Sequence, residues 1–455
     1  MRTIGVGLLG VGTVGGGVAT LVARHRADLE ARLGARLEIV RAAVRDRSRA
    51  RPPELDASVL TTDAREVLAD DRVEIVVELI GGVEPARELV LGALARGKHV
   101  VTANKKLLAE AGAELFAAAT KANVDLLYEA AVCGGIPIIR TLREALASDR
   151  VSSVVGIVNG TTNFILGRMA DEGASFEAAL KEAQRLGFAE ADPTADVEGH
   201  DAAAKLTLLA ALAFGARLSP AMVATEGITK LAPIDHAYAK DFGLTVKLLA
   251  IARRVAGGAT SASESGAAHS IELRVAPAMV PSQSLLAGVR GAFNAVLVRC
   301  DALGPIFLHG QGAGALPTAS AVVADLVELG RTLGQRGVGG RVPHLAYQDA
   351  SIAETPALAV ADSTGTFYVR FTVVDEPGVL ARLAGSLGAR GVSIASLVQR
   401  EHTPLADGGG EPVAVVVVTH EARERAVRAA VAEIDALPFA RAPTRVVRIE
   451  RALEA

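Results

Sequence analysis

A lysine inside an apolar helix is the first residue of this sequence that could do chemistry. The stretch EGHDAAAKLTLLAALAF, residues 198–214, predicts a helix from His200 onward, with Asp201 and Lys205 on one face. A helix that is apolar on nearly every side is usually buried, and a buried ammonium needs a partner, a water-filled cleft or a lowered pKa. The alternative is an exposed ion pair between the two residues, which their spacing of four would also allow. Taken alone, the stretch favours the exposed pair, because most charged residues lie in water.

A glycine-rich turn near residue 10 predicts a dinucleotide site. GLLGVGTVG places a G-x-G-x-x-G motif between a predicted strand and a predicted helix. The first glycine permits the turn, the second lets a pyrophosphate approach the backbone, and the third packs helix on strand, while the helix N-terminus supplies N–H groups. The motif is weak by itself, but its place in a βαβ pattern strengthens it. The cofactor contacts expected here are Gly10, Gly12, Thr13, Val14 and Gly15.

The end of the second predicted strand, AAVRDRSRAR, bears on the choice of cofactor. A site specific for NAD normally places a carboxylate here for the ribose 2′-hydroxyl. In this chain Arg45 comes first and Asp46 follows, with further arginines at Arg47, Arg49 and Arg51. Guanidinium groups suit a 2′-phosphate, so we expect a preference for NADP(H), with Arg45 as a contact. A solvated basic turn, with Asp46 binding NAD(H), is the alternative.

A second lysine of interest follows another predicted strand. HVVTANKKLLAEAG places Lys105 and Lys106 just beyond the carboxyl end of a parallel strand, where open α/β sheets bind ligands. This position favours a cleft for Lys105. A surface loop explains Lys106 equally well.

Composition excludes several classes of protein. The 455 residues carry 48 Lys+Arg against 51 Asp+Glu, a formal net charge of −3, so no footprint for nucleic acid is expected. No uncharged apolar run reaches the length of a membrane span, and the first ten residues do not resemble a signal peptide. The two cysteines, Cys133 and Cys300, allow neither a disulfide framework nor a cysteine-rich zinc site. We therefore expect a cytoplasmic protein.

The elements that must position these residues form three modules. Short apolar strands alternate with helices over residues 3–100, which predicts a parallel sheet covered on both faces. The expected strands include residues 125–132, and one expected helical stretch covers residues 14–34. Later segments predict an α+β domain and then a small C-terminal module. The expected division is 1–135 for a Rossmann-type domain completed by a returning helix near 316–333, 136–315 for a catalytic and dimerisation domain, 334–365 for a linker and 366–455 for the last module.

Five stretches together resemble the homoserine dehydrogenase family. They are GLLGVGTVG, VVTANKKLLA, YEAAVCGGIPII, GIVNGTTNFIL and GFAEADPTADVEGHDAAAKL, in order across about residues 3–330. The resemblance implies interconversion of L-homoserine and L-aspartate 4-semialdehyde with NAD(P), in threonine, methionine and isoleucine biosynthesis. It also implies a homodimer or homotetramer.

The resemblance assigns roles residue by residue. Lys205 matches the family's acid/base lysine, and Lys105 a second lysine near the nicotinamide and substrate. Glu190 and Asp201 match the carboxylates that hold homoserine. Desolvation and a cationic neighbour can lower the pKa of a lysine toward ~7–8, which suits proton transfer from an alcohol. Gly187 and Gly312 match backbone contacts to the cofactor.

The stretch YEAAVCGGIP matches the family's loop for a monovalent cation. By that match Glu129, Val132, Gly134 and Ile136 supply oxygens, mostly backbone carbonyls, to a sodium ion. An ordinary glycine-rich strand end, with Glu129 capping something nearby, is the alternative. No catalytic metal is expected.

The C-terminal stretch VVDEPGVLARLAGSLGARGVSIASLVQ resembles an ACT domain, a ferredoxin-like βαββαβ regulatory module. In this family such modules pair and bind an amino acid, and the effector implied here is L-threonine. Asp375, Gly378 and Ser393 are the expected contacts. A module that only mediates assembly is the alternative.

Two rival functions remain at the level of sequence. The first is a dehydrogenase of the aspartate-semialdehyde type that uses Cys133 as nucleophile, although a small buried filler is the simpler interpretation of this cysteine. The second is a non-catalytic sensor of nucleotide and amino acid, which would not need both lysines in intact motifs.

Overall fold

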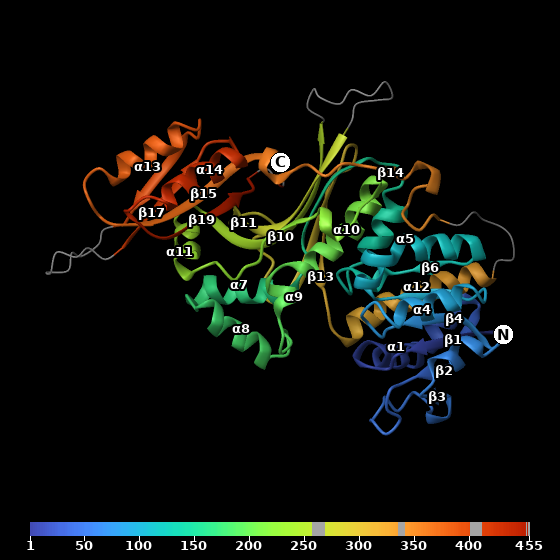
Figure 1. Cartoon of the computed structure of the whole chain (residues 1–455). Coiled ribbons are helices and arrows are strands. Elements are labelled where there is room, and N and C mark those ends of the chain that lie inside the picture. The colour runs from blue at the N-terminus through green and yellow to red at the C-terminus, as the bar shows by residue number, and fades with distance from the viewer. Residues whose placement is uncertain (257–268, 335–341, 401–411, 452, 454–455) are drawn as a thin grey trace. The chain divides into compact units, whose positions relative to one another are not determined.

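The computed structural model describes residues 1–256, 269–334, 342–400, 412–451 and 453 (Figure 1). Part of the expected linker, residues 335–341, lies outside them. The chain forms two compact units, each built from separate segments. The first comprises Met1–Gly160, Asp201–Met222 and Phe293–Thr355, and the second Thr161–His200, Val223–Ala292 and Pro356–Ala455. Among the described helices, none is long and apolar enough to cross a membrane.

A six-stranded parallel sheet forms the centre of the first unit, as the alternating sequence pattern predicts. Its strand order is β3-β2-β1-β4-β5-β6. The strands are β3 (Leu60–Thr61), β2 (Ala35–Ala43), β1 (Arg2–Leu9), β4 (Val73–Glu78), β5 (His99–Thr102) and β6 (Leu126–Leu127). Chain order reverses between β1 and β4, and at such a switch point doubly wound sheets bind ligands beyond the carboxyl ends of their strands.

Helices cover this sheet, and one of them comes from much later in the chain. They are α1 (Thr13–Arg24), α2 (Arg26–Leu33), α3 (Ala64–Ala69), α4 (Ala86–Leu94), α5 (Lys105–Ala122) and α12 (Ala315–Gly334). Val322 and Leu326 of α12 are buried in the same apolar core as Ile4 of β1 and Val18 of α1. A Cβ atom at Gly17 would lie 2.7 Å from the carbonyl oxygen of Ala315, so the glycine lets α1 and α12 approach closely.

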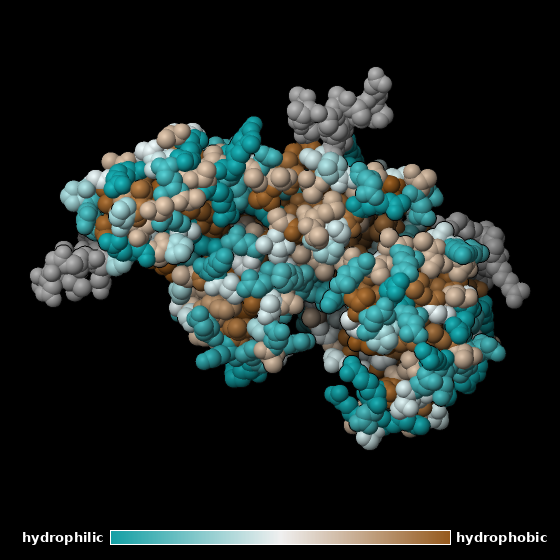
Figure 2. All heavy atoms as spheres, viewed as in Figure 1, coloured by the Kyte–Doolittle hydropathy of each residue, from teal (hydrophilic) through white to brown (hydrophobic). Residues whose placement is uncertain are grey.

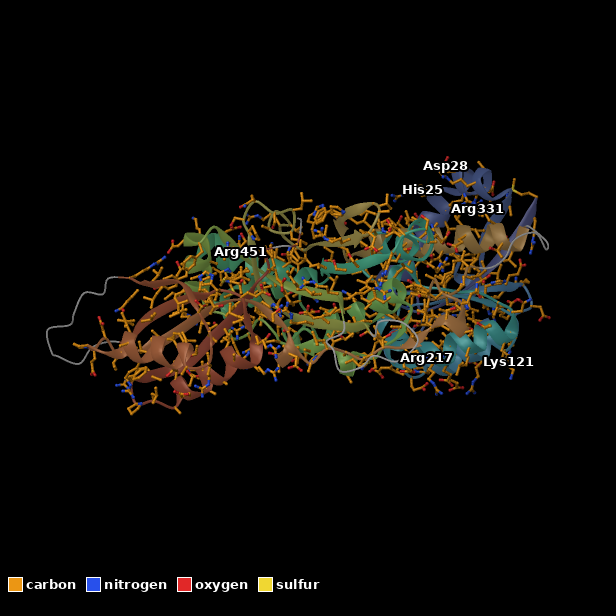
Figure 3. The ribbon with its side chains drawn as sticks, turned by 90° about the horizontal axis from the view of Figure 1, so that it is seen from above. His25, Asp28, Lys121, Arg217, Arg331 and Arg451 are labelled. Atoms are coloured by element: carbon orange, nitrogen blue, oxygen red, sulfur yellow. The ribbon has the colours of Figure 1, made fainter. Side chains whose placement is uncertain are left out.

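Two expected elements differ from the structure. The helix expected over residues 14–34 turns at His25, which ends α1 and precedes α2, and the side chains of His25 and Asp28 point outward there (Figure 3). Of the strand expected over residues 125–132, only Leu126 and Leu127 pair, as β6. The chain then enters a 3₁₀ turn at Glu129–Ala131. The backbone N–H of Glu129 donates to the carboxylate of Asp325 on α12, at 2.9 Å, instead of to a strand.

The first unit also contains three antiparallel strands and the apolar helix. The strands pair in the order β13 (Gly304–Gln311), β12 (Phe293–Cys300) and β7 (Val151–Ile157). The helix is α10 (His200–Phe214), in which every residue from Ala202 to Phe214 except Ala204 is buried. Two short strands, β8 (Ala216–Arg217) and β14 (Ala353–Glu354), pair in parallel.

The second unit begins with helices and two long strands. These elements are α7 (Gly160–Glu172), α8 (Phe176–Arg185), α9 (Thr194–Val197), β9 (Ala224–Thr225), α11 (Pro233–Asp241), β10 (Leu244–Ala256) and β11 (His269–Pro281). β10 pairs with β11 in antiparallel register along its full length, and β9 adds a short parallel pair to β11.

The C-terminal module has the expected βαββαβ order. Its elements are β15 (Thr364–Val373), α13 (Val379–Gly388), β16 (Ile394–Gln399), β17 (Val413–Thr419), α14 (Glu424–Asp435) and β19 (Ala440–Ile449). The sheet order is β19-β15-β17-β16, with a short strand β18 (Ala422–Arg423) beside β15. Alternate residues of β15, such as Phe367 and Phe371, share a core with α13 and α14. The opposite face of β15 contacts α11, because Tyr368 and Arg370 bond to the buried carboxylate of Asp235.

The module continues the earlier sheet of the second unit. β19 pairs with β15 and also, in parallel, with β11 through Ala278–Arg448 and Met279–Ile449. Polar side chains cover much of the face seen in Figure 2, with smaller apolar patches between them.

Candidate active site

One buried carboxylate of the first unit holds two lysines. Lys205 Nζ lies 2.7 Å from Asp201 Oδ2, and Lys105 Nζ lies 2.9 Å from Asp201 Oδ1. Lys205 also donates to the carbonyl oxygen of Val158 at 2.7 Å, and the amide of Asn159 donates to Asp201 Oδ2 at 3.0 Å. We call Lys105, Asp201 and Lys205 the lysine cluster.

Burial and access differ between the two lysines. The side chain of Lys205 is 11 % exposed and that of Lys105 is 39 % exposed. Both line a cleft of about 290 Å³, together with the loop after β4, the start of α5 and Gly312. The pair of Asp201 and Lys205 is therefore not an exposed ion pair, although its spacing alone would allow one. Burial raises the pKa of Asp201, but the ammonium groups of Lys205 and Lys105 outweigh it and lower that pKa well below its usual range.

Local structure explains why Lys105 lies at the cleft. It is the first residue of α5, directly after the carboxyl end of β5. The Asn104 side chain accepts a hydrogen bond from Leu107 N at 3.1 Å and so caps the helix. Asn104 also donates to the carbonyl oxygen of Gly82 at 2.6 Å, which ties the helix start to the loop after β4.

A buried glutamate that the sequence analysis missed shapes the same loop. Glu78 ends β4 and is fully buried. Its Oε1 accepts from the backbone N–H groups of Ile80 and Gly81, at 2.8 and 3.2 Å, and its Oε2 accepts from Thr102 at 2.6 Å. Ile80 and Gly81 line the cleft, so Glu78 fixes one of its walls. A carboxylate at the end of the apolar run VEIVVELIG was the available signal.

The glycine-rich turn leads into the same cleft through Val14. Gly10 has a left-handed φ of +103°, and a Cβ atom there would lie 2.9 Å from the carbonyl oxygen of Leu79. A Cβ atom at Gly15 would lie 2.3 Å from Gly10 O, so neither position accepts a side chain. Gly12, which precedes α1, has open space instead, and Thr13 begins the helix. An unobstructed helix N-terminus suits a phosphate group.

The arginine-rich turn after β2 is tied to this motif. Arg51 donates to the carbonyl oxygens of Val11 and Asp46, the latter at 3.0 Å. The carboxylate of Asp46 accepts from the N–H and hydroxyl of Ser48, at 2.8 and 2.6 Å, and these bonds lower its pKa. Arg45 is exposed beside it.

The loop that follows β6 curls sharply. Cys133 and Gly134 both have left-handed φ angles, 56° and 47°. Cys133 is buried, and burial raises the pKa of its thiol to about 11. The neighbouring residues Val132 and Ile136 are buried as well.

Glu129, just before this loop, is buried and caps a helix. Its carboxylate accepts the backbone N–H groups of Ile139 and Arg140 at 2.9 and 2.8 Å. Burial raises its pKa. Across the described residues, no group of three or more His, Cys, Asp or Glu side chains is placed to hold a metal ion.

Gly187 and Glu190 belong to the second unit, between α8 and α9, and both are exposed. Gly187 has a left-handed φ of +76° after the end of α8. The carbonyl oxygen of Glu190 accepts from Gln184 Nε2 at 3.1 Å. Neither residue therefore belongs to the group of first-unit residues around Asp201.

Family models and curated relatives match nearly all of the chain. The model of the homoserine dehydrogenase NAD-binding domain matches residues 10–129, that of homoserine dehydrogenase matches 137–327, and that of the ACT domain matches 367–436. A homoserine dehydrogenase of Neisseria gonorrhoeae is 43% identical over 451 residues, 99% of each chain. One from Mycobacterium tuberculosis is 45% identical over 455 residues, 99% of this chain and 98% of the relative.

Solved structures agree with these matches. A homoserine dehydrogenase from Thiobacillus denitrificans superposes with a TM-score of 0.89 and 47% identity, covering 99% of both chains. A hyperthermophilic archaeal homoserine dehydrogenase in complex with NADPH covers 74% of this chain and all of its own, with a TM-score of 0.60 and 27% identity. The fold, the glycine-rich turn and these matches define an NAD(P)-dependent oxidoreductase that acts on a CH–OH group. The chain belongs to the homoserine dehydrogenase family, as the sequence motifs predict.

Proposed function

We propose that the cleft at the lysine cluster is where this chain interconverts L-homoserine and L-aspartate 4-semialdehyde, with Lys205 as the acid/base. The main support for this role is the position of Lys205. Its side chain is nearly buried, lines the cleft and bonds to Asp201 and to the carbonyl oxygen of Val158. These two contacts fix where its amino group lies.

The cofactor supplies or accepts a hydride when bound. Gly10, Gly12, Thr13, Val14 and Gly15 would hold its pyrophosphate, and the open space at Gly12 supports this. Gly187 and Gly312 would contribute further backbone contacts, as the sequence motifs suggest.

We favour NADP(H) over NAD(H). The carboxylate of Asp46 is bonded to Ser48 within its own turn, while the guanidinium group of Arg45 is exposed next to it. An exposed guanidinium group suits a 2′-phosphate better than it suits a 2′-hydroxyl group. The archaeal relative with bound NADPH supports the same preference.

The residues of the chain move the proton. In alcohol oxidation the neutral amine of Lys205 takes the hydroxyl proton as the hydride leaves the adjoining carbon. In the reverse direction the Lys205 ammonium returns that proton to the aldehyde oxygen. Asp201 orients this group, and Lys105 supplies a second positive charge at the cleft. The sequence motifs assign the substrate's α-ammonium group to Asp201 and Glu190.

A sodium ion at the loop of residues 129–136 is part of the proposal. The consecutive left-handed residues Cys133 and Gly134, and the hydrogen bond from Ile136 N to Cys133 O at 3.0 Å, curl the backbone as a cage of carbonyls requires. Glu129, Val132, Gly134 and Ile136 would supply oxygen ligands, which hard cations prefer. The carboxylate of Glu129 already caps a helix, so the ion's role would be structural.

The remaining proposals concern regulation and assembly. The ACT module would respond to L-threonine, with Asp375, Gly378 and Ser393 as candidate contacts. Gln399 donates to the carboxylate of Asp375 at 3.1 Å, which orders this turn. We also propose a cytoplasmic homodimer or homotetramer.

The test is NADPH oxidation with L-aspartate 4-semialdehyde by wild type and Lys205→Ala, with NADPH binding measured in both. We expect turnover to fall by about 10²–10⁴-fold while NADPH binding stays within about twofold. Lys106→Ala is the matched control, since Lys106 is an exposed lysine of the same unit, and it should keep full activity. Wild-type turnover in Lys205→Ala would move the acid/base role elsewhere.

A further inference from the structure

One fully buried carboxylate of the first unit is not among the groups that move the proton. Glu78 is the last residue of β4, at the carboxyl end of the parallel sheet. A carboxylate that leaves water is costly unless hydrogen-bond donors replace the lost water. The donors around Glu78 therefore indicate what the residue is for.

Both oxygens of this carboxylate accept hydrogen bonds. Oε1 accepts from the backbone N–H groups of Ile80 and Gly81, at 2.8 and 3.2 Å. Oε2 accepts from the hydroxyl of Thr102, at 2.6 Å. Thr102 ends the neighbouring strand β5 and lies opposite Glu78 in the parallel register. The carboxylate thus joins the ends of two adjacent strands.

Thr102 extends this contact to the residue that precedes α5. Its Oγ1 accepts from the backbone N–H of Asn104 at 3.0 Å, while its hydroxyl proton goes to Glu78. A hydroxyl can do both because it has one donor and two acceptor positions. Asn104 therefore donates to Thr102, and Thr102 donates to Glu78. An ionised carboxylate only accepts, so it is suited to end this series of bonds.

Asn104 is held at its backbone and at both ends of its side-chain amide. Its Nδ2 donates to the carbonyl oxygen of Gly82 at 2.6 Å and lies 3.5 Å from Glu78 Oε1. Its Oδ1 accepts from the backbone N–H of Leu107 at 3.1 Å. Because Asn104 is buried, these bonds fix the start of α5 against the ends of β4 and β5.

The residue after Asn104 is Lys105, whose side chain reaches the cleft. Its Nζ lies 2.9 Å from Asp201 Oδ1, and its side chain is half-buried. A long lysine side chain has many rotamers, so the position of its backbone strongly affects how often its ammonium reaches a given partner. That backbone position follows directly from Asn104.

We propose that Glu78 is a positioning residue for the reaction: through Thr102 and Asn104 it fixes the start of α5 and so holds the Lys105 ammonium at the cleft. This inference rests on the proposed function, since it takes Lys105 as part of the active site. Glu78 itself is buried behind the wall of the cleft, and its effect on turnover passes through Lys105.

A second set of contacts of Glu78 serves that wall. Ile80 and Gly81, which line the cleft, bond to its Oε1, whereas Thr102 bonds to its Oε2. The two oxygens therefore hold two different parts of the site. Thr102→Val removes the hydroxyl that links Glu78 to Asn104 and leaves the bonds to Ile80 and Gly81 in place.

The first test is a double-mutant cycle between Thr102 and Lys105. We measure kcat/KM with NADPH and L-aspartate 4-semialdehyde for wild type, Thr102→Val, Lys105→Met and the double variant. Thr102→Val alone should lower kcat/KM by about tenfold, because a shifted start of α5 moves Lys105 out of place. In the Lys105→Met background the same substitution should lower kcat/KM by less than about twofold, since the group through which it acts is gone.

The cycle separates failure of this inference from failure of the proposed function. If Thr102→Val causes the same loss in both backgrounds, it acts independently of Lys105 and the positioning role is overturned, while Lys105 keeps its own role. Wild-type kcat/KM in Thr102→Val also overturns the positioning role. If Lys105→Met alone has wild-type activity, the proposed role of Lys105 fails, and Glu78 has no active-site group to position.

Variants of Glu78 test the carboxylate itself. Glu78→Ala leaves its three donors without an acceptor and should lower kcat/KM at least as much as Thr102→Val. Glu78→Gln keeps the side-chain length and one acceptor oxygen, so it should recover kcat/KM to within about fivefold of wild type. Glu74→Ala is the matched control on β4: its ion pair with Arg2 is exposed, so activity should stay at the wild-type level. Wild-type activity in Glu78→Ala, or no recovery in Glu78→Gln, would contradict the positioning role.

Hydrogen–deuterium exchange of the unliganded protein gives a readout that does not depend on turnover. The backbone N–H groups of Leu107 and Leu108 both bond to Asn104, each at 3.1 Å. Thr102→Val should speed their exchange, because it loosens Asn104, whereas Lys105→Met should leave it unchanged. The affinity for NADPH should stay at the wild-type value in Thr102→Val, since the wall of the cleft keeps its bonds to Glu78. Unchanged exchange in Thr102→Val would show that the start of α5 does not depend on this series of bonds.

Discussion

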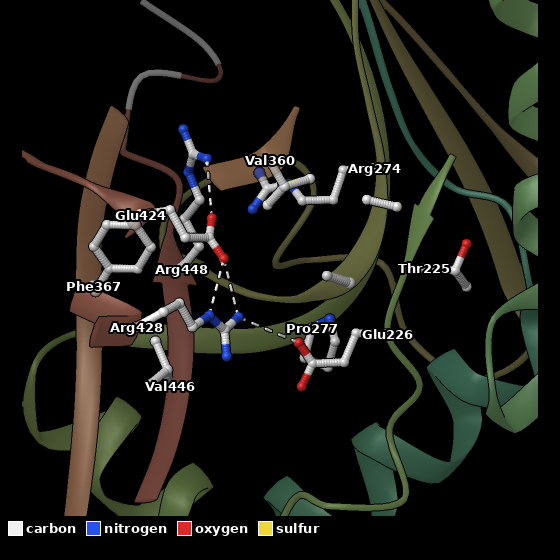
Figure 4. Close-up of a pocket in the computed structure, with 12 residues that line it drawn as sticks. Thr225, Glu226, Arg274, Pro277, Val360, Phe367, Glu424, Arg428, Val446 and Arg448 are labelled. Atoms are coloured by element: carbon white, nitrogen blue, oxygen red, sulfur yellow. Dashed lines mark hydrogen bonds and ion pairs between the residues drawn. The ribbon is translucent and has the colours of Figure 1, made fainter. Parts of the chain in front are cut away.

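The first unit places two lysines on one carboxylate, whereas the second places buried arginines on one. Asp201 holds one ammonium group on each of its oxygens, and Glu450 holds the guanidinium groups of Arg274 and Arg448. A lysine can lose its proton when its surroundings favour the neutral amine, but a guanidinium cannot in a protein. The lysine cluster is therefore suited to moving a proton. The second unit's arginine–glutamate cluster is suited to fixing structure and charge; it consists of Arg274, Arg448, Glu272, Glu424 and Glu450, of which Figure 4 labels Arg274, Arg448 and Glu424.

The two clusters also differ in access. Lys105 is 39 % exposed at the cleft, so substrate can reach the lysine cluster. Side chains of the arginine–glutamate cluster are all less than 8 % exposed. Substitutions in the lysine cluster should therefore lower turnover, and substitutions in the arginine–glutamate cluster should lower stability.

The largest effect is expected from Arg274→Met, on stability. Arg274→Met removes one of three cationic partners of the buried Glu450 carboxylate and leaves Arg253 and Arg448. Breaking a buried ion pair costs about 3–5 kcal/mol, and we expect the lower end of that range because the other two partners remain. Native-state hydrogen exchange of the β11 and β19 amides measures this loss. Arg290→Met is the control, because its ion pair with Asp171 is exposed and contributes at most about 1 kcal/mol. If both variants lost the same amount of stability, the buried ion pairs of Arg274 would not stabilise this sheet more than an exposed pair does.

The next effect concerns turnover. Lys105→Met should lower kcat/KM by about 10²-fold, since it removes a positive charge from the cleft while keeping the length of the side chain. Lys106→Met, one residue further and exposed, should stay within about twofold. Stopped-flow measurement with NADPH distinguishes the two variants. Similar rates for both would remove Lys105 from the site.

A smaller effect is expected from pH. Burial, followed by Lys247, lowers the pKa of His236 to about 4, against the opposing effect of Asp235. The unfolded state takes up a proton near the ordinary histidine value of about 6.5, and the folded state does so only near 4. Stability contributed by this group is thus full above the unfolded pKa and is lost as pH falls toward 4. Between pH 7 and 5 we expect a loss of about 2 kcal/mol, read from urea midpoints, that His236→Leu largely removes.

The smallest effect separates this enzyme from a cysteine-dependent rival. Burial raises the pKa of the Cys133 thiol to about 11, so the thiol stays protonated at neutral pH. Cys133→Ala should therefore keep turnover within about twofold. Complete loss of turnover, with NADPH binding intact, would favour a covalent mechanism instead.

Local sequence signals predicted most of the architecture. The alternating pattern of residues 3–100 predicted the parallel sheet, and the order of elements predicted the C-terminal module. The 13-residue strand β10 was not anticipated, because its identity as a strand depends on pairing with β11 across the intervening segment. The strand expected over residues 125–132 was mostly wrong for a similar reason: a distant carboxylate, Asp325, takes the N–H of Glu129.

The candidate site shows the same limit. Helical spacing predicted that Asp201 and Lys205 share a face, and the strand-end rule placed Lys105 near the cleft. The carboxylate of Asp201 also bonds to Lys105, which lies on another helix nearly a hundred residues earlier in the chain. No local sequence pattern predicts a contact between such distant helices. The role of Glu78 was missed because its partners are backbone N–H groups and Thr102.

The pairing of β19 with both β15 and β11 has a consequence for how the chain is made. The second unit is assembled from three separate stretches of chain. Strand β19 (Ala440–Ile449) lies in the last stretch and pairs with β11, which lies in the middle one. During synthesis, β11 must wait while more than a hundred and fifty further residues leave the ribosome. Translation at ~5–20 residues per second makes this wait on the order of ten seconds or longer. During that period the part of the β11 edge that later pairs with β19 still waits for its partner strand.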